Sequence, residues 1–195
     1  AFEINLLDRV IVALDSPKAR EPGTFQWEAT LWHELAHVIT IQMSNQRVPR
    51  WLTEGVSEYE QKQARPEWAR QMDIEFADLM VKGQVIKLSD LNAAFTDPRK
   101  IGMAYFQGSV VVEHIVETYG AAGLNKLLRA YADGLDTDAA LKSALNTDFS
   151  QMQSGFDETL ERRFGALRRA LSGTDEATVA KKSVEELKLM ATAEP

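Results

Sequence analysis

The stretch Trp27-Glu28-Ala29-Thr30-Leu31-Trp32-His33-Glu34-Leu35-Ala36-His37-Val38-Ile39-Thr40-Ile41 decides the fold of this chain. It contains the pattern His-Glu-x-x-His, and two of the chain's three histidines lie in it. Residues four apart project from one face of a helix, so His33 and His37 can bind one metal ion together. Zinc is the metal that this pattern indicates most directly.

The residues around the pattern predict a helix over 25–45. No proline or glycine interrupts this segment, and Thr24 stands ahead of it as a candidate N-cap. Apolar residues cover most of the helix circumference, which predicts burial on several sides. Buried imidazoles and carboxylates need partners, and a metal ion with its bound water would supply them.

The composition, 45% apolar and 26% charged over 195 residues, is typical of one soluble globular domain. A net charge of -7 leaves no basic face for phosphates, which argues against a nucleic-acid partner. Without cysteine, any zinc ligands must be imidazole or carboxylate. The chain lacks an initial methionine and any run of about 18 apolar residues, so we expect a soluble piece of a longer precursor without a transmembrane segment. A periplasmic or extracellular location would fit this expectation.

The fold class that we expect is mainly α with a short N-terminal β element. The β-branched run 10–14, closed by a turn, predicts a strand. Proline, glycine and apolar periodicity then predict helices, with a break at Gly120. The predicted helical segments are 49–65, 66–81, 88–95 (a short turn), 99–119, 121–133, 137–146, 149–171 and, in the tail, 181–190.

Two imidazoles leave zinc short of ligands, and Glu54 is the best candidate for the third. Sixteen residues separate it from His37, enough for a turn that brings a second helix back antiparallel. Glu58 lies one turn further on the same face, where it could accept the free ring N–H of a ligand histidine. Glu34 lies about 100° around the helix from His33, which suits a general base beside the metal.

Hydrolysis of a peptide bond also needs a donor for the developing oxyanion. Tyr105, near the start of a predicted helix, is our choice for this catalytic role. His114 and Tyr119 are weaker alternatives, because residues of these types in apolar helices more often serve the core.

The segments His33-Glu34-Leu35-Ala36-His37 and Trp51-Leu52-Thr53-Glu54-Gly55-Val56-Ser57-Glu58 together resemble the gluzincin zinc metallopeptidases, which include thermolysin-like enzymes and zinc aminopeptidases. They are most similar to the peptidase-MA-like domains of bacteria, which often accompany tetratricopeptide repeats. The resemblance implies that His33, His37 and Glu54 bind zinc, that Glu34 is the base, and that Glu58 supports the ligands from behind. It also implies that 10–14 is the edge strand beside which an extended peptide substrate binds.

The resulting prediction is a single zincin-like metallopeptidase domain over 1–171, with an active-site half (1–65) and a helical half (66–171). Residues 172–195 would form a linker and a peripheral helix. The expected reaction is hydrolysis of peptide bonds by a zinc-bound water that Glu34 activates. Two alternatives stay open: a catalytically silent zincin-like binding or scaffold domain of a larger, repeat-containing protein, and a structural helical domain with a chance motif.

Overall fold

The computed structural model describes residues 26–173 and Glu186, and this part of the chain is helical and contains no strand. The elements are α1 (Trp27–Met43), α2 (Arg50–Ala64), η2 (Pro66–Trp68), α3 (Asp73–Val81), η3 (Leu88–Asp90), α4 (Leu91–Ala94), α5 (Ile101–Ala132), α6 (Thr137–Leu145) and α7 (Phe149–Ser172). The mainly helical class is therefore confirmed for the described residues. The predicted strand 10–14, the Thr24 cap and the tail helix 181–190, except Glu186, lie outside them.

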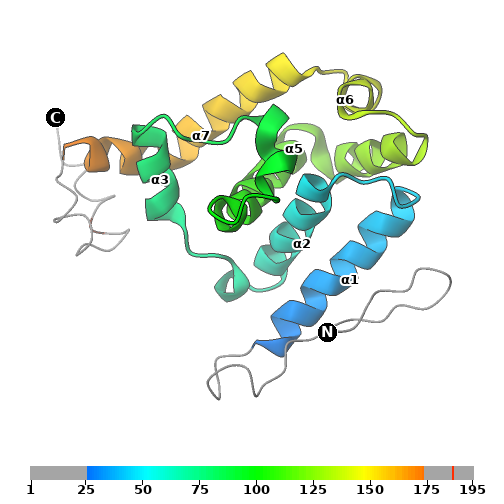
Figure 1. Ribbon diagram of the computed structural model, residues 1–195, viewed down its shortest axis with the longest axis horizontal. Coiled ribbons are helices and arrows are strands. Elements are labelled where there is room, and N and C mark those ends of the chain that lie inside the picture. The colour runs from blue at the N-terminus through cyan, green and yellow to red at the C-terminus, as the bar shows by residue number, and fades with distance from the viewer. Residues whose placement is uncertain (1–25, 174–185, 187–195) are drawn as a thin grey trace.

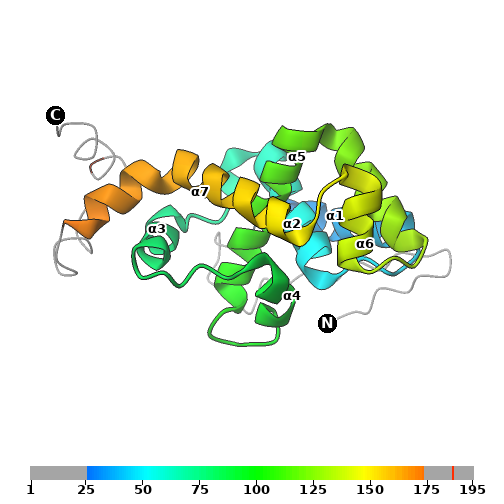
Figure 2. The ribbon, with the colours of Figure 1, turned by 90° about the horizontal axis from the view of Figure 1, so that it is seen from above.

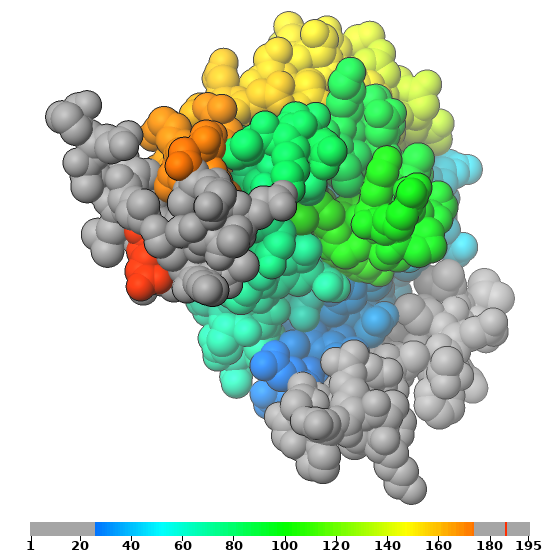
Figure 3. All heavy atoms as spheres, turned by 60° about the vertical axis from the view of Figure 1, so that its left-hand side comes forward, coloured from blue at the N-terminus to red at the C-terminus, as the bar shows by residue number. Residues whose placement is uncertain are grey.

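The helices are arranged around a central pair, α2 and α5, which pack closely on each other. Helix α1 lies along α2 on one side of this pair, while α7 crosses over the other side, where it packs against α3 (Figures 1 and 2). In the space-filling view the chain forms bands, from blue α1 at the bottom to yellow α7 at the top (Figure 3). No helix of the described residues is long and apolar enough to cross a membrane.

Two glycines allow the close crossing of α2 and α5. A Cβ atom added at Gly55 would lie only 2.6 Å from the carbonyl oxygen of Gly108. Glycine has no Cβ, so the two backbones can meet at this point. The crossing brings Tyr105, one turn before Gly108, against Glu54, the neighbour of Gly55.

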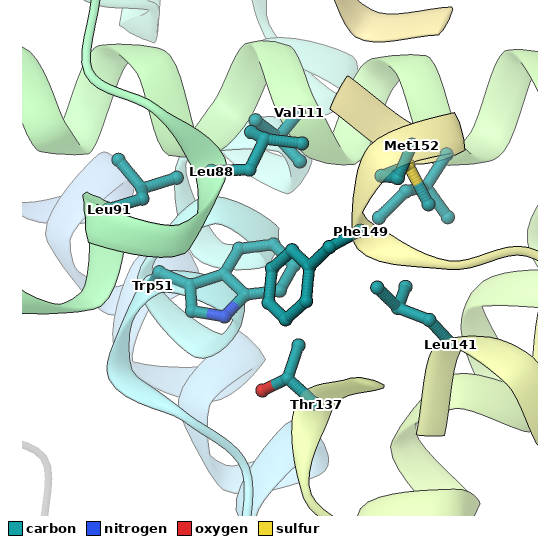
Figure 4. A pocket seen from close by; sticks show the side chains of 9 residues that line it. Trp51, Leu88, Leu91, Val111, Thr137, Leu141, Phe149 and Met152 are labelled. Carbon is teal, nitrogen blue, oxygen red and sulfur yellow. The ribbon is translucent and has the colours of Figure 1, made fainter. Parts of the chain in front are cut away.

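Trp51 anchors the first turn of α2 in the core. Its indole packs with side chains from η3, α4, α5, α6 and α7 around a cavity of about 10 Å³ (Figure 4). Its backbone N–H, which has no partner within the first turn of a helix, donates to Oδ1 of Asn92 at 3.2 Å. These contacts fix the rotation of α2, and therefore the direction in which Glu54 projects.

The structure corrects the predicted helix 66–81. Only Pro66–Trp68 and Asp73–Val81 are helical, because Ala69 adopts an extended backbone (φ -66°, ψ 146°). This break turns Arg70 back onto α2, where its guanidinium pairs with Glu58. The break predicted at Gly120 is confirmed: this residue has φ 71° and ψ 170°, a conformation that glycine tolerates, and it separates the two halves of α5.

Burial of α1 on several sides was also predicted, and that prediction is wrong. The side chains of Trp27, Trp32, Leu35 and Ile39 on this helix are 44–58% exposed. Helix α1 lies at the edge of the bundle and packs mainly on α2, so only one face is covered by the described residues. An apolar groove of about 330 Å³ runs between this helix and the side chains of α2 and α5.

Candidate metal centre

The two histidines of α1 point at each other across one turn of the helix. Their ring centroids lie 4.8 Å apart, and their Nε2 atoms are 3.1 Å apart. Both side chains are largely buried, with 14% of His33 and 12% of His37 exposed. The four-residue spacing therefore brings the two rings close enough to bind one metal ion together.

Glu54 of α2 completes the group. Its Oε2 lies 3.3 Å from Nε2 of His33 and 3.2 Å from Nε2 of His37. These three residues are the one set of His, Cys, Asp or Glu side chains among the described residues whose ligand atoms converge closely enough to hold a metal ion. The structure thus brings together the three residues predicted as ligands.

The separations of these atoms fit a tetrahedral metal. Metal–ligand distances of 2.0–2.2 Å, as for zinc with nitrogen and oxygen, imply about 3.3–3.6 Å between two ligand atoms of a regular tetrahedron. The observed edges of 3.1, 3.2 and 3.3 Å are within a few tenths of that value. The donor set, two imidazoles and one carboxylate, is also one that zinc accepts.

The charges of the group attract one another strongly. Burial raises the pKa of Glu54, but hydrogen bonds from His33 and His37 outweigh it and hold that pKa well below its usual range. Burial lowers the pKa of His33, but hydrogen bonds to Glu54 and Gln61 outweigh it and raise the pKa above its usual value. A carboxylate that stays ionised is what a cation site requires.

The second carboxylate oxygen of Glu54 faces away from the histidines. Its Oε1 accepts hydrogen bonds from Nε of Arg50 at 3.3 Å and from the hydroxyl of Tyr105 at 3.2 Å. Because Oε1 is occupied in this way, Oε2 is left free to face the histidines. Sequence reasoning missed Arg50, although its position four residues before Glu54 on a helix was a usable signal.

A chain of hydroxyl groups sets the tautomer of His37. Thr40 donates to the carbonyl oxygen of His37 at 3.1 Å, so the 2.7 Å bond between the two threonine hydroxyls has Thr53 as its donor. Thr53 Oγ1 then accepts from Nδ1 of His37 at 2.7 Å. With a proton held on Nδ1, the other ring nitrogen of His37, Nε2, faces Glu54 and His33 and is the one that can give a lone pair to a metal ion.

Glu58 does not make the hydrogen bond that was expected of it. Its Oε1 lies 3.9 Å from Nδ1 of His33, and that nitrogen instead contacts Oε1 of Gln61 at 2.8 Å. The buried carboxylate of Glu58 accepts from Nε of Arg70 at 2.9 Å, and the Arg70 guanidinium lies over the ring of Tyr105 at 4.6 Å. Gln61 and Arg70 were missed; the seven-residue spacing from Glu54 could have suggested Gln61.

Glu34 lies on α1 between the two histidines and is half-buried. No hydrogen bond or ion pair links its carboxylate to another side chain in the part of the chain that the structure describes.

His114 is elsewhere, buried against α7, where Nδ1 bonds to the hydroxyl of Thr159 at 2.9 Å. Tyr119 packs beside Gly123 in the second half of α5. Neither His114 nor Tyr119 contacts the histidine pair.

The described part of the chain is thus a helical domain whose two neighbouring helices present a group able to hold a metal ion. The model of the peptidase MA superfamily matches residues 19–161, more than half of the chain. The chain therefore belongs to the peptidase MA superfamily. No curated protein matches it, and no solved structure matches it.

Proposed function

We propose that the protein is a zinc-dependent peptidase of the gluzincin type. The observation that carries this proposal is the convergence of His33, His37 and Glu54 at tetrahedral separations, in a chain of the peptidase MA superfamily. His33 and His37 would each give an Nε2 lone pair, and Glu54 would give Oε2. Bound there, zinc would supply Lewis acidity, which acidifies water and polarises a carbonyl group.

Glu34 would act as the general base. It stands about 100° around α1 from His33, so its carboxylate borders the metal ligands without joining them. Since no described side chain engages it, this carboxylate can accept a proton from water and return it to the leaving amine of the cleaved peptide. A group that carries a proton in this way is needed for turnover but not for holding the metal.

Tyr105 would provide the hydrogen-bond donor for the oxyanion. Burial, with the nearby charge of Glu54, raises the pKa of its phenol above the usual value, so the hydroxyl keeps its proton at neutral pH. In this structure it donates to Glu54, and its ring lies 6.4 Å from the ring of His33. The hydroxyl is thus a donor within one side-chain movement of a substrate carbonyl that lies beside the ligands.

Two substitutions test the proposal directly. Glu34→Ala should retain one zinc per chain, measured by elemental analysis, while hydrolysis of a peptide library falls by about 10²–10⁴-fold. Glu54→Ala should lose the zinc itself. Glu28→Ala is the matched control, since Glu28 is an exposed residue of the same helix paired with Arg65, and it should change neither property.

Hydrolysis by the zinc-loaded protein should also stop when a chelator is added. Full activity of Glu34→Ala would refute the base assignment. Stoichiometric zinc without cleavage of any peptide would instead point to a catalytically silent binding domain. The substrate class that we propose is a peptide or protein.

A further inference from the structure

The side chain that holds the outer nitrogen of His33 is an amide, not the carboxylate one turn away. We propose that Gln61 is the positioning residue that orients His33 toward the metal, in place of Glu58. This inference rests on the proposed function, because it concerns the geometry of the same site.

The antiparallel packing of α1 and α2 explains why Gln61 reaches this position. Glu54, Glu58 and Gln61 are spaced i, i+4 and i+7, so all three lie on one face of α2. The later histidine of α1, His37, meets the earlier part of α2, while His33 meets the later part. His33 therefore lies opposite Gln61, which is 9% exposed and is placed two turns beyond Glu54.

The position of Glu58 excludes it from the role in this structure. Its Oε1 is 3.9 Å from Nδ1 of His33, beyond hydrogen-bond distance, whereas Oε1 of Gln61 is at 2.8 Å. The same oxygen of Glu58 accepts from Arg70 at 2.9 Å, in a charge-assisted bond. Moving it to His33 would leave the Arg70 guanidinium without this partner.

The chemistry follows from what an amide oxygen can do. It accepts and cannot donate, so His33 must carry its proton on Nδ1 and present the lone pair of Nε2 to the metal. The hydroxyl oxygen of Thr53 accepts the Nδ1 proton of His37 in the same way. Both outer partners are neutral, and among the described residues Glu54 is the one carboxylate within hydrogen-bond distance of the histidine pair.

Zinc affinity of three variants separates Gln61 from Glu58. In competition with a chromophoric chelator, Gln61→Leu should bind zinc about 10–100-fold more weakly, because the Nδ1 proton loses its acceptor. Gln61→Glu keeps an acceptor at the same place and should stay within about threefold of the wild type. Glu58→Gln should also stay within about threefold, because Glu58 does not hold His33. Weak binding by Glu58→Gln together with normal binding by Gln61→Leu would overturn the inference.

Proton exchange of the imidazole gives a readout that does not depend on zinc. In the metal-free protein at a pH of about 5, both ring nitrogens of His33 carry protons, and the Nδ1 proton should exchange slowly with water because Gln61 accepts it. Gln61→Leu should speed this exchange in ¹⁵N–¹H spectra, and Gln61→Glu should slow it again. If the wild type takes up no zinc but shows the slow exchange, the proposed function fails while the contact between Gln61 and His33 stands. If Gln61→Leu changes neither zinc affinity nor the exchange of the Nδ1 proton, the inference is wrong.

Discussion

Replacing Gly55 with alanine tests how the α2–α5 crossing supports the site. The new Cβ would lie 2.6 Å from the carbonyl oxygen and 2.8 Å from the carbonyl carbon of Gly108, and 3.1 Å from Cγ2 of Val112. Two of these three atoms belong to the backbone, so a side-chain rotation cannot relieve the contact. Ordinary contact begins at 3.4 Å, so the helices must separate by about 0.8 Å at this point.

The size of the effect follows from two opposing contributions. Overpacking costs about 1–3 kcal/mol, and rigid backbone contacts favour the upper end of that range. Alanine gains about 1 kcal/mol over glycine within a helix, which leaves a net loss of about 2 kcal/mol. For a domain of this size the melting temperature should fall by about 4–8 °C.

Urea or thermal unfolding of the metal-free protein measures this loss. Gly102→Ala is the matched control, because it lies in α5 and its Cβ would meet nothing within 4 Å. It should be neutral or stabilising by up to about 1 kcal/mol. Zinc affinity should fall as well in Gly55→Ala, because α2 carries Glu54 and the 3.2 Å bond from Tyr105 spans the crossing. A Gly55→Ala protein as stable as the wild type would refute the reasoning.

Four further changes have definite expected outcomes. The Ser57 hydroxyl is buried without a hydrogen-bond partner, so Ser57→Ala should leave the free energy of unfolding unchanged or raise it by about 1 kcal/mol; a clear loss would reveal a hidden partner. Tyr105→Phe should leave zinc bound but lower kcat, since the donor is lost; unchanged kcat would remove Tyr105 from catalysis. Zinc at 100 times its Kd should stabilise the wild type by about 2.7 kcal/mol and leave Glu54→Ala unaffected in calorimetry. Burial lowers the pKa of His114 below 6.5, so the unfolded chain binds a proton there that the folded protein does not. The free energy of unfolding therefore decreases as pH falls below 6.5. Urea unfolding of the metal-free protein should show a smaller decrease in His114→Asn.

The sequence by itself determined the features that depend on local spacing. The i, i+4 spacing of His33 and His37 places both rings on one face of any helix, and a glycine at position 120 can take a positive φ that other residues avoid. Glu54 could also be predicted as the third ligand, because a short connection between two helices leaves few ways to bring a carboxylate back to the face that carries His33 and His37. These are properties of a helix and a turn, which the sequence carries in short segments.

Only the tertiary structure decided which side chains hydrogen-bond to the candidate ligands from the side away from the metal. Glu58 and Gln61 share one face of α2, and their spacing alone cannot show which of them reaches His33. The choice depends on Arg70, which returns from a break after α2 that local pattern did not predict, and which occupies Glu58. The exposure of apolar side chains on α1 likewise depends on its place at the edge of the bundle. Contacts between segments distant in the chain are set by how helices pack, and that information is not local in the sequence.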